Sequence, residues 1–342
     1  MKLVRFLLFP FAILYDIITT IRNILFDVGV FKSTSFQIPV IVVGNLSVGG
    51  TGKTPQIEYL ISVLKNRFKV AVLSRGYKRK TKGFVLLNGS HNALDVGDEP
   101  LQYFKKFNEI DVAVNANRVE GIQRLIKSTS PEIILLDDAY QHRKVKGSFY
   151  VLLTKFNDLF TNDFLLPTGN LRESRSGAQR ADIIIVTKCP TNLSDFQQEE
   201  IKQKLIKFDK KVFFTTISYR NILSSDKKIA LSALKEYAIL LITGIANPAP
   251  LVDFLVTNKN NFKHLKYADH HHFSSVEIEK IKKEFDEIKS DKKIILTTEK
   301  DYTRLSGELQ NLFFIEIETH FFGGQNKEFD QIINAHIQQN RC

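Results

Sequence analysis

A glycine-rich segment constrains this chain more than any other part of its sequence. Residues 47–54 read Ser-Val-Gly-Gly-Thr-Gly-Lys-Thr and follow an apolar run at 38–43 that predicts a buried strand. A helical pattern begins near Lys53. A strand, a glycine loop ending in Gly-Lys-Thr and a helix together predict a phosphate-binding P-loop. Its backbone N–H groups and the helix N-terminus would surround a polyphosphate, and the loop comprises Ser47, Val48, Gly49, Gly50, Thr51 and Gly52. The only departure is Ser47, where a glycine is usual.

Two further features fit a nucleotide bound with Mg²⁺. In a P-loop the lysine, here Lys53, reaches the β- and γ-phosphates, and the hydroxyl of Thr54 is a metal ligand. An apolar strand at 132–136 ends in Asp137 and Asp138, where a carboxylate would hold Mg²⁺ directly or through water. The chain lacks the asparagine of the guanine-reading Asn-Lys-x-Asp motif at 187–188 and 298–301, so GTP specificity is not indicated.

Apolar strands alternate with helices along most of the chain. Continuous Val/Ile/Leu runs predict a parallel sheet that is covered by helices on both faces. Residues 212–219 alternate and predict a strand in a connecting ribbon. The other expected strands lie at 38–43, 68–74, 111–114, 132–136, 149–153, 182–187, 238–243, 262–267 and 293–297. We therefore expect an α/β protein with a P-loop NTPase-like, mostly parallel sheet and a second, smaller α/β domain.

Charge and cysteine content limit the choice of partners. A net charge of +11 over 342 residues favours an anionic partner: nucleic acid, a phospholipid surface or a phosphorylated substrate. Nucleic acid is disfavoured, because the sequence has no recognisable module and no interleaving of aromatic and basic residues. Cys189 and Cys342 lie far apart, so neither a disulfide framework nor zinc-site spacing is present.

The first 31 residues are rich in Leu, Ile and Phe, yet they contain Lys2, Arg5, Asp16 and Arg22. The longest uncharged stretch, at 6–15, is shorter than the roughly 20 residues that cross a bilayer. Wound as a helix, most polar residues share one side, with Arg22 as the exception, and Pro10 is expected to bend the helix. We expect an amphipathic helix that lies on a membrane; a buried core helix and a true span are the alternatives.

Polar residues at other expected turns are candidates for chemistry. Asp98 and Glu99 lie in a Gly–Pro turn, where Asp98 is suited either to accept a proton from a hydroxyl or to cap a helix. Arg172 is suited to clamp a phosphate or to pair with a nearby acid. A basic loop at 75–82 suits phosphate, lipid headgroups or solvent alone. For the histidines at 270–272 a metal site is disfavoured, because adjacent side chains point in different directions.

Together these motifs resemble the tetraacyldisaccharide 4′-kinase (LpxK) family, the lipid A 4′-kinases of Gram-negative bacteria. The matching segments follow one another in the same order over most of the chain. They are 44–55 (GNLSVGGTGKTP), 74–77 (SRGY), 97–100 (GDEP), 117–118 (NR), 136–138 (LDD) with 141–142 (QH), 166–167 (LP), 171–173 (LRE), 244–248 (GIANP), 269–270 (DH) and 298–301 (TEKD).

The resemblance implies ATP-dependent phosphorylation of the 4′-hydroxyl of the lipid A precursor tetraacyldisaccharide 1-phosphate. It implies a peripheral enzyme on the cytoplasmic face of the bacterial inner membrane, which we expect to be a monomer. It also implies that Asp98 is the general base with His270 beside it. Arg118 and Arg172 would stabilise the transferring phosphoryl group or the substrate phosphate. Because His270 lies in the second domain, the two domains would have to close for reaction.

The expected domains are a membrane-associating helix at 1–31, a P-loop kinase domain at 32–211, and a smaller α/β domain at 212–342 that includes the ribbon and a C-terminal helix.

The alternative to a kinase is a membrane-associated regulatory NTPase of the MinD or metallochaperone type, which shares the glycine loop. MinD-like ATPases usually carry a lysine near the start of that loop, where this chain has Ser47 and Val48.

Overall fold

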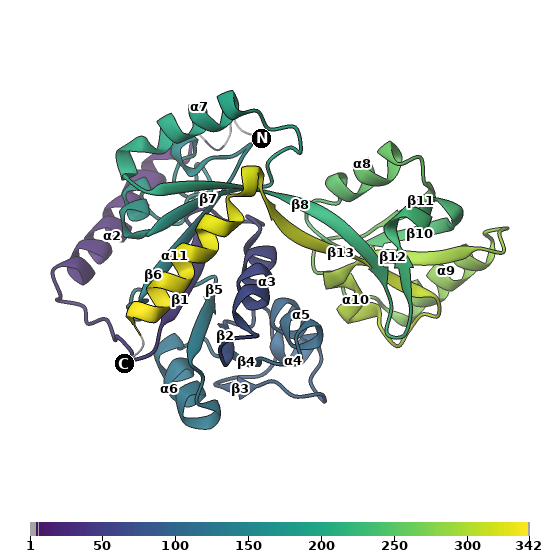
Figure 1. The fold of residues 1–342 in the computed structure, drawn as a ribbon, viewed down its shortest axis with the longest axis horizontal. Helices are drawn as coiled ribbons and strands as arrows, with labels where there is room; N and C mark the ends of the chain where they lie inside the picture. The colour runs from purple at the N-terminus through teal and green to yellow at the C-terminus, as the bar shows by residue number, and fades with distance from the viewer. Residues whose placement is uncertain (1–4, 6, 341–342) are drawn as a thin grey trace.

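The structure is a computed structural model that describes residues 5 and 7–340. Two regions are joined by a long ribbon of two strands (Figure 1). We call residues 32–214 and 322–340 the P-loop region, and residues 215–321 the second region. Short 3₁₀ helices occur in both, at Phe160–Asn162, Arg175–Arg180, Ile206–Phe208, Leu231–Glu236 and Phe322–Gly324.

The P-loop region is built on a mostly parallel sheet with the order β7-β6-β1-β5-β2-β4-β3, in which only the short β3 runs antiparallel to its neighbour. Its strands are β1 Val40–Asn45, β2 Val70–Ser74, β3 Val85–Leu86, β4 Asp111–Val114, β5 Ile133–Asp137, β6 Phe149–Lys155 and β7 Ile183–Thr187. Its helices are α3 Lys53–Leu64, α4 Ala93–Val96, α5 Asp98–Lys106, α6 Arg118–Thr129, α7 Asp195–Leu205 and α11 Asn326–Gln339.

Both faces of this sheet are buried, which explains the continuous apolar runs in the sequence. In β1, Ile41 and Val43 belong to the core on the side of α3, whereas Val40 and Val42 belong to the core on the side of α6. The polar residues that follow these strands then gather at the carboxyl edge of the sheet. The expected P-loop architecture is confirmed.

The second region repeats the α/β pattern at smaller size. Strands β11, β10, β12 and β13 are parallel neighbours in that order. Its strands are β9 Lys228–Ala230, β10 Ala238–Thr243, β11 Asn261–Lys266, β12 Lys293–Thr298 and β13 Leu312–Phe321, and its helices are α8 Ala249–Thr257, α9 Ser275–Asp286 and α10 Glu299–Leu305. The sequence analysis did not predict β13, although this segment is the partner of the ribbon strand.

The ribbon consists of β8, Lys211–Leu223, and β13, which pair antiparallel. The first residues of β8 pair with β7, so one strand passes from one region into the other. After β13 the chain returns to the P-loop region, where Phe329, Ile333 and Ile337 of α11 are fully buried in the α3-side core. The C-terminal helix therefore packs with the P-loop region, and its expected place in a 212–342 domain is wrong.

A buried ion network connects the two regions beneath the ribbon. Lys106 of α5 lies 2.8 Å from Glu58 of α3 and 2.8 Å from Glu299 of α10. Gln102 donates to Glu58 at 2.7 Å. Burial and the neighbouring carboxylate raise the pKa of Glu299, because one ammonium cannot compensate two buried carboxylates fully. The network fixes α10 of the second region against the helix that follows the P-loop.

The N-terminal helix α2, Phe9–Asp27, lies along the P-loop region with its polar side inward. Tyr15 donates to the carbonyl of Arg172 at 2.8 Å, and Arg22 donates to that of Gln141 at 2.8 Å. Arg22 thus lies on the same side as the other polar residues, whereas the helical wheel placed it nearer the apolar ones. Pro10 lies in the first turn of α2, and the bend expected there involves preceding residues that lie partly outside the described part of the chain. Lys2 lies outside the described residues.

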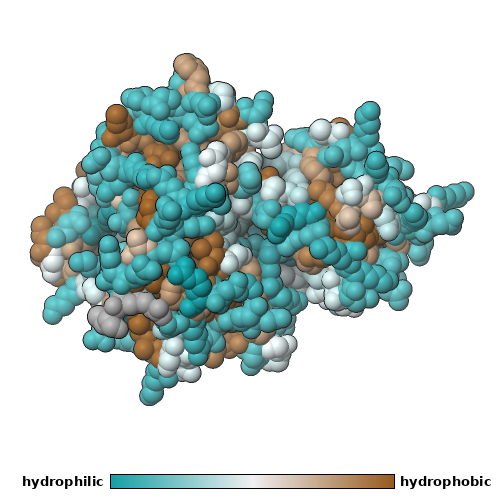
Figure 2. Space-filling model, in the orientation of Figure 1, coloured by the Kyte–Doolittle hydropathy of each residue, from teal (hydrophilic) through white to brown (hydrophobic). Residues whose placement is uncertain are grey.

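The opposite side of α2 is apolar and faces solvent. Figure 2 shows hydrophobic surface at the left edge of the molecule, where Figure 1 places this helix. Its exposed residues include Phe11, Ile13, Leu14, Ile17, Ile18, Ile21 and Ile24, each at least half exposed. By length and composition α2 is apolar enough to cross a bilayer. Only 6% of its 18-residue apolar window is buried inside the protein. An exposed apolar face of this extent marks an interaction surface.

Candidate active site

A cleft of about 2540 Å³ lies between the two regions. One wall carries P-loop residues 48–54 with Asp137 and Asp138, and the other carries His270 and Lys300 from the second region. Glu99 lines the cleft, whereas the neighbouring Asp98 is not among its lining residues in the described part of the chain. The cleft thus brings the predicted phosphate site and the predicted proton-transfer site to opposite walls of one space.

The P-loop has the backbone geometry that its glycines allow. Gly52 has a φ of +85° and stands at the N-cap of α3, where a residue with a side chain would be strained. Thr187, at the end of β7, donates to the carbonyl of Thr51 at 2.8 Å and supports the loop. Ser47 is buried, outside the cleft, and Val48 donates its N–H to Asn170 at 2.8 Å. Residues 48–54, including Thr54, are therefore the part of the loop that can face a nucleotide.

Lys53 and the two aspartates form one cluster at the sheet edge. The ammonium of Lys53 lies 3.5 Å from Asp138 and donates to Asn45 at 3.3 Å. Burial would raise the pKa of Asp138, but Lys53 and Arg172 outweigh it and lower that pKa. Asp137 is buried, and burial together with the charge of the adjacent Asp138 raises the pKa of Asp137 to about 6. Ser74 donates to Asp137 at 3.1 Å. A buried carboxylate beside a second one is suited to a divalent cation.

The two predicted arginines occupy different surroundings. Arg172 lines the cleft and lies 3.1 Å from Asp138, so it is both paired with an acid and available to an anionic ligand. Arg118 is 2% exposed and does not line the cleft; its guanidinium donates to the backbone carbonyls of Asn115 and Asp137. Burial lowers the pKa of Arg118 to about 10. In this arrangement Arg118 supports the turn after β5 and touches no open space.

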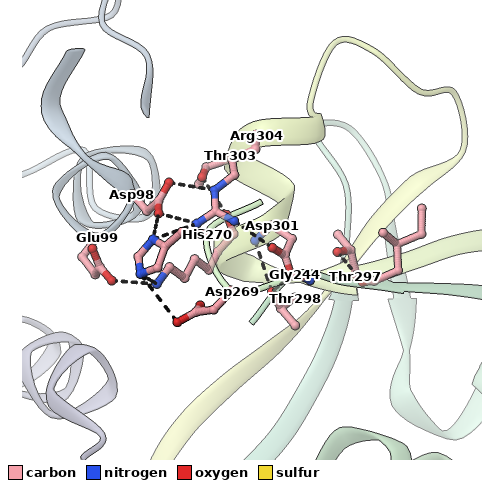
Figure 3. Close-up of polar contacts among 12 residues, drawn as sticks. Asp98, Glu99, Gly244, Asp269, His270, Thr297, Thr298, Asp301, Thr303 and Arg304 are labelled. Atoms are coloured by element: carbon pink, nitrogen blue, oxygen red, sulfur yellow. Dashed lines mark hydrogen bonds and ion pairs between the residues drawn. The ribbon is translucent and has the colours of Figure 1, made fainter. Parts of the chain in front are cut away.

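Asp98 and His270 come together from the two regions, as Figure 3 shows. Nδ1 of His270 lies 2.7 Å from Oδ2 of Asp98. Arg304 of α10 donates from Nε to Oδ1 of Asp98 at 2.9 Å and from a terminal nitrogen to Oδ2. Burial would raise the pKa of Asp98, but His270 and Arg304, with the charge of Lys300, hold it well below its usual range. Arg304 was not predicted from the sequence.

Lys300 completes this group of charged side chains. Its ammonium lies 3.2 Å from Nε2 of His270 and 2.9 Å from Glu99. Because an ammonium can only donate, Nε2 is the acceptor and Nδ1 carries the proton that points at Asp98. The geometry therefore assigns the neutral tautomer of His270 through its two neighbours.

The structure excludes one of the two interpretations of Asp98 that the sequence left open, the helix cap. Gly97, with a φ of +95°, is the N-cap of α5, and no side chain caps this helix. Asp98 is the first residue of α5 and turns toward the second region. The carboxylate therefore does not act as a helix cap, and its hydrogen bonds to His270 and Arg304 account for its burial.

Comparisons with known proteins find relatives over nearly the whole chain. The sequence model of the family described as "Tetraacyldisaccharide-1-P 4'-kinase" matches residues 4–338. A tetraacyldisaccharide 4'-kinase of Flavobacterium psychrophilum is 55% identical over 98% of this chain and 97% of its own length. A tetraacyldisaccharide 4'-kinase of Bacteroides thetaiotaomicron is 43% identical over 97% of this chain and 93% of its own length.

A solved structure is similar over the same extent. The crystal structure of LpxK from Aquifex aeolicus in complex with ATP has a TM-score of 0.80 and 30% sequence identity, covering 98% of this chain and 99% of that chain. Agreement in sequence and in fold over nearly the whole length shows that the chain belongs to the tetraacyldisaccharide-1-P 4'-kinase family.

Proposed function

We propose that the protein is a kinase that transfers the γ-phosphate of ATP to the 4′-hydroxyl of a tetraacyldisaccharide 1-phosphate, a precursor of lipid A. The observation that carries this proposal is the arrangement of the cleft. A P-loop lines one wall, and the Asp98–His270 pair adjoins the other. Phosphoryl transfer to a hydroxyl needs both elements, because the nucleotide must be held in line and the hydroxyl proton must be accepted.

The P-loop wall binds the nucleotide in this proposal. The N–H groups of residues 48–54 and Lys53 hold the phosphates, and Arg172 reaches them from the loop that pairs with the start of the P-loop. Thr54, Asp137 and Asp138 are oxygen donors suited to Mg²⁺, which would neutralise charge on the β- and γ-phosphates. Because the pKa of Asp137 is raised to about 6, protons compete with the cation for this carboxylate at mildly acidic pH.

The opposite side accepts the proton of the substrate hydroxyl through the Asp98–His270 pair. Asp98 was expected to be the base; in this proposal its carboxylate acts together with the imidazole of His270 as one unit. Arg118, whose guanidinium is held by backbone carbonyls, stabilises charge only if closure of the cleft reorients it. The two regions meet at α5 and α10, so closure would align the hydroxyl with the nucleotide.

A transfer assay with labelled ATP and a panel of lipid and water-soluble acceptors tests this function. We expect label on the 4′-position of the tetraacyldisaccharide 1-phosphate, and little on acceptors that lack the acylated disaccharide. ATP hydrolysis that no acceptor stimulates and that yields no labelled lipid would contradict the kinase and favour the regulatory NTPase alternative.

We also propose that the protein is peripheral on the cytoplasmic face of the inner membrane, with α2 lying in the surface of the bilayer. The inward side of α2 hydrogen-bonds to the P-loop region, so the helix cannot cross a bilayer without breaking those contacts. Its outward side is apolar, and the excess positive charge of the chain attracts anionic lipid. Tyr15, Thr19 and Arg22 of the same helix also line the cleft, which brings the active site to the membrane surface.

Replacing Ile18 and Ile21 by glutamate should weaken binding to vesicles that contain an anionic phospholipid. Both side chains are more than half exposed in the protein. Loss of two isoleucines that the membrane would bury should lower the partition coefficient on the order of 10²-fold or more. Vesicle flotation measures the effect. High salt should partly release the wild type, because screening weakens attraction to the lipid.

The matched control carries the same two charges on exposed apolar residues elsewhere, Phe196→Glu and Val276→Glu. This control should bind vesicles like the wild type. Equal binding of both double variants would contradict docking through α2. Wild-type protein that leaves the membrane only in detergent, at every salt concentration, would favour a transmembrane helix.

A further inference from the structure

Both carboxylate oxygens of Asp98 are taken by donors from the second region. Oδ1 accepts from Nε of Arg304 at 2.9 Å, and Oδ2 accepts from Nδ1 of His270 and from the other arm of the Arg304 guanidinium. That arm also lies 3.4 Å from Nδ1, so two donors converge on one oxygen. The side chains of Asp98 and Arg304 are 9% and 4% exposed. A bidentate pair in such a site fixes the direction of the carboxylate as well as its distance.

Arg304 is itself held by the framework that carries His270. Its remaining nitrogen lies 3.1 Å from Asp301, a fully buried carboxylate. Asp301 accepts from the N–H of Gly244 at 2.9 Å, and the carbonyl of Gly244 accepts from the N–H of His270 at 3.1 Å. Figure 3 shows this series of contacts. Arg304 therefore places Asp98, which belongs to the P-loop region, relative to the loop that presents the imidazole.

The cleft reaches only one member of the pair. His270 and Lys300 line it, whereas Asp98 stays behind them. Nε2 of His270 is the nitrogen turned away from Asp98. It accepts from the ammonium of Lys300 at 3.2 Å, in the place where a substrate hydroxyl would donate. A hydroxyl that displaces Lys300 thus meets the imidazole and not the carboxylate.

We infer that Arg304 is a positioning residue for proton transfer: it holds both oxygens of Asp98 and so fixes the carboxylate against Nδ1 of His270. This inference rests on the proposed kinase function. In the step, the O–H bond of the acceptor breaks and its proton binds Nε2. The acceptor oxygen forms a bond to the γ-phosphorus, the bond from that phosphorus to the β–γ bridging oxygen breaks, and ADP leaves with the electron pair. The imidazolium keeps its Nδ1–H on Asp98 and later releases the Nε2 proton to solvent.

Several charged groups face the pair and decide its response to pH. From α10 these are Arg304 and Lys300, and from α5 it is Glu99. The carboxylate of Asp269 lies 3.9 Å from Nε2, and the ring of Tyr77 packs edge-on against the imidazole. Only Arg304 contacts Asp98 with both arms. Removal of its charge should therefore make the pair easier to protonate.

Arg304→Met removes the charge but keeps an apolar side chain of similar length. We expect kcat for the lipid acceptor to fall on the order of 10²-fold, because a small displacement of the pair is costly, while KM for ATP stays near the wild-type value. The acidic limb of the kcat–pH profile should move to higher pH, since the pair loses a positive neighbour. Arg304→Lys keeps the charge without the two-armed contact, so kcat should fall less and the limb should stay in place.

The control is Lys292→Met, which removes an exposed ion pair with Glu236 in the same region and should leave rate and profile unchanged. Arg304 would have only a structural role if the methionine variant melted at a lower temperature than the wild type while its kcat and the acidic limb of its kcat–pH profile were unchanged. If that variant does not fold, a lysine variant with wild-type kcat overturns the inference equally. A wild type that labels no acceptor would instead contradict the kinase function itself, before any variant is compared.

Discussion

The Lys53→Ala variant is expected to fold normally and to lose phosphate transfer by at least 10²–10³-fold, a typical effect of removing one preorganised contact to transition-state charge. Lys53 is the P-loop lysine, and its ammonium lies in the cleft 3.5 Å from Asp138. Lys53 is the first residue of α3 and follows the glycine loop directly. Loss of this side chain removes the positive charge that compensates the β- and γ-phosphates in the proposed reaction.

The fold should survive because the partner of Lys53 is not left alone. Asp138 keeps its contact with Arg172 at 3.1 Å, so no unpaired buried carboxylate results. A matched control is Lys65→Ala at the other end of α3, which breaks an ion pair with Glu109 outside the cleft. Single-turnover transfer and thermal unfolding measure the two variants. Near-normal transfer by folded Lys53→Ala protein would contradict nucleotide binding by this P-loop in the proposed reaction.

The features that the sequence predicted are those encoded by neighbouring residues. The P-loop and the Asp137–Asp138 pair each follow a buried strand, and parallel strands bring such turns to one edge. The order of the strands alone therefore predicts that Lys53 and Asp138 lie close together, as they do in the structure. The parallel sheet was predictable for the same reason, since its strands are buried on both faces and read as continuous apolar runs.

Contacts between distant segments were not predictable in this way. Asp98 and His270 are 172 positions apart, and only the family resemblance suggested that they meet. Arg304 gave no signal, because an Asp–Arg pair three residues apart on a helix is usual on a solvated surface. The packing of α11 against the P-loop region depends on the return of β13 through the ribbon, a strand that the sequence analysis had not identified.

For the N-terminal helix, periodicity predicted a polar and an apolar side but not which of them faces the protein. The wheel separated polar from apolar residues, yet it left open which side faces the protein. Hydrogen bonds from the helix to two loops far along the chain decide this. Tyr15 and Asn23 donate to the loop at 172–173, and Arg22 donates to the loop at Gln141. The apolar side is outward because the P-loop region offers carbonyls and a carboxylate at this surface.

Asp98→Asn and His270→Ala are expected to reduce kcat strongly and non-additively, because the two side chains act as one unit. Loss of a general base typically costs 10²–10⁴-fold, whereas ATP affinity should change little, since neither group contacts the P-loop. If proton transfer depends on the pair, the double variant should be hardly slower than the worse single variant. The adjacent, exposed His272→Ala provides the control and should behave like the wild type.

Stability separates this result from simple loss of structure. Asp98→Asn leaves the buried guanidinium of Arg304 with Asp301 as its remaining acid partner, so a lower melting temperature is expected for that variant. His270→Ala removes an imidazole from the cleft wall and should unfold closer to the wild-type temperature. A rate loss that both variants share, against unequal losses of stability, points to chemistry. Multiplicative rate losses would show that the two residues contribute separately, and Asp98 would then have to act without His270.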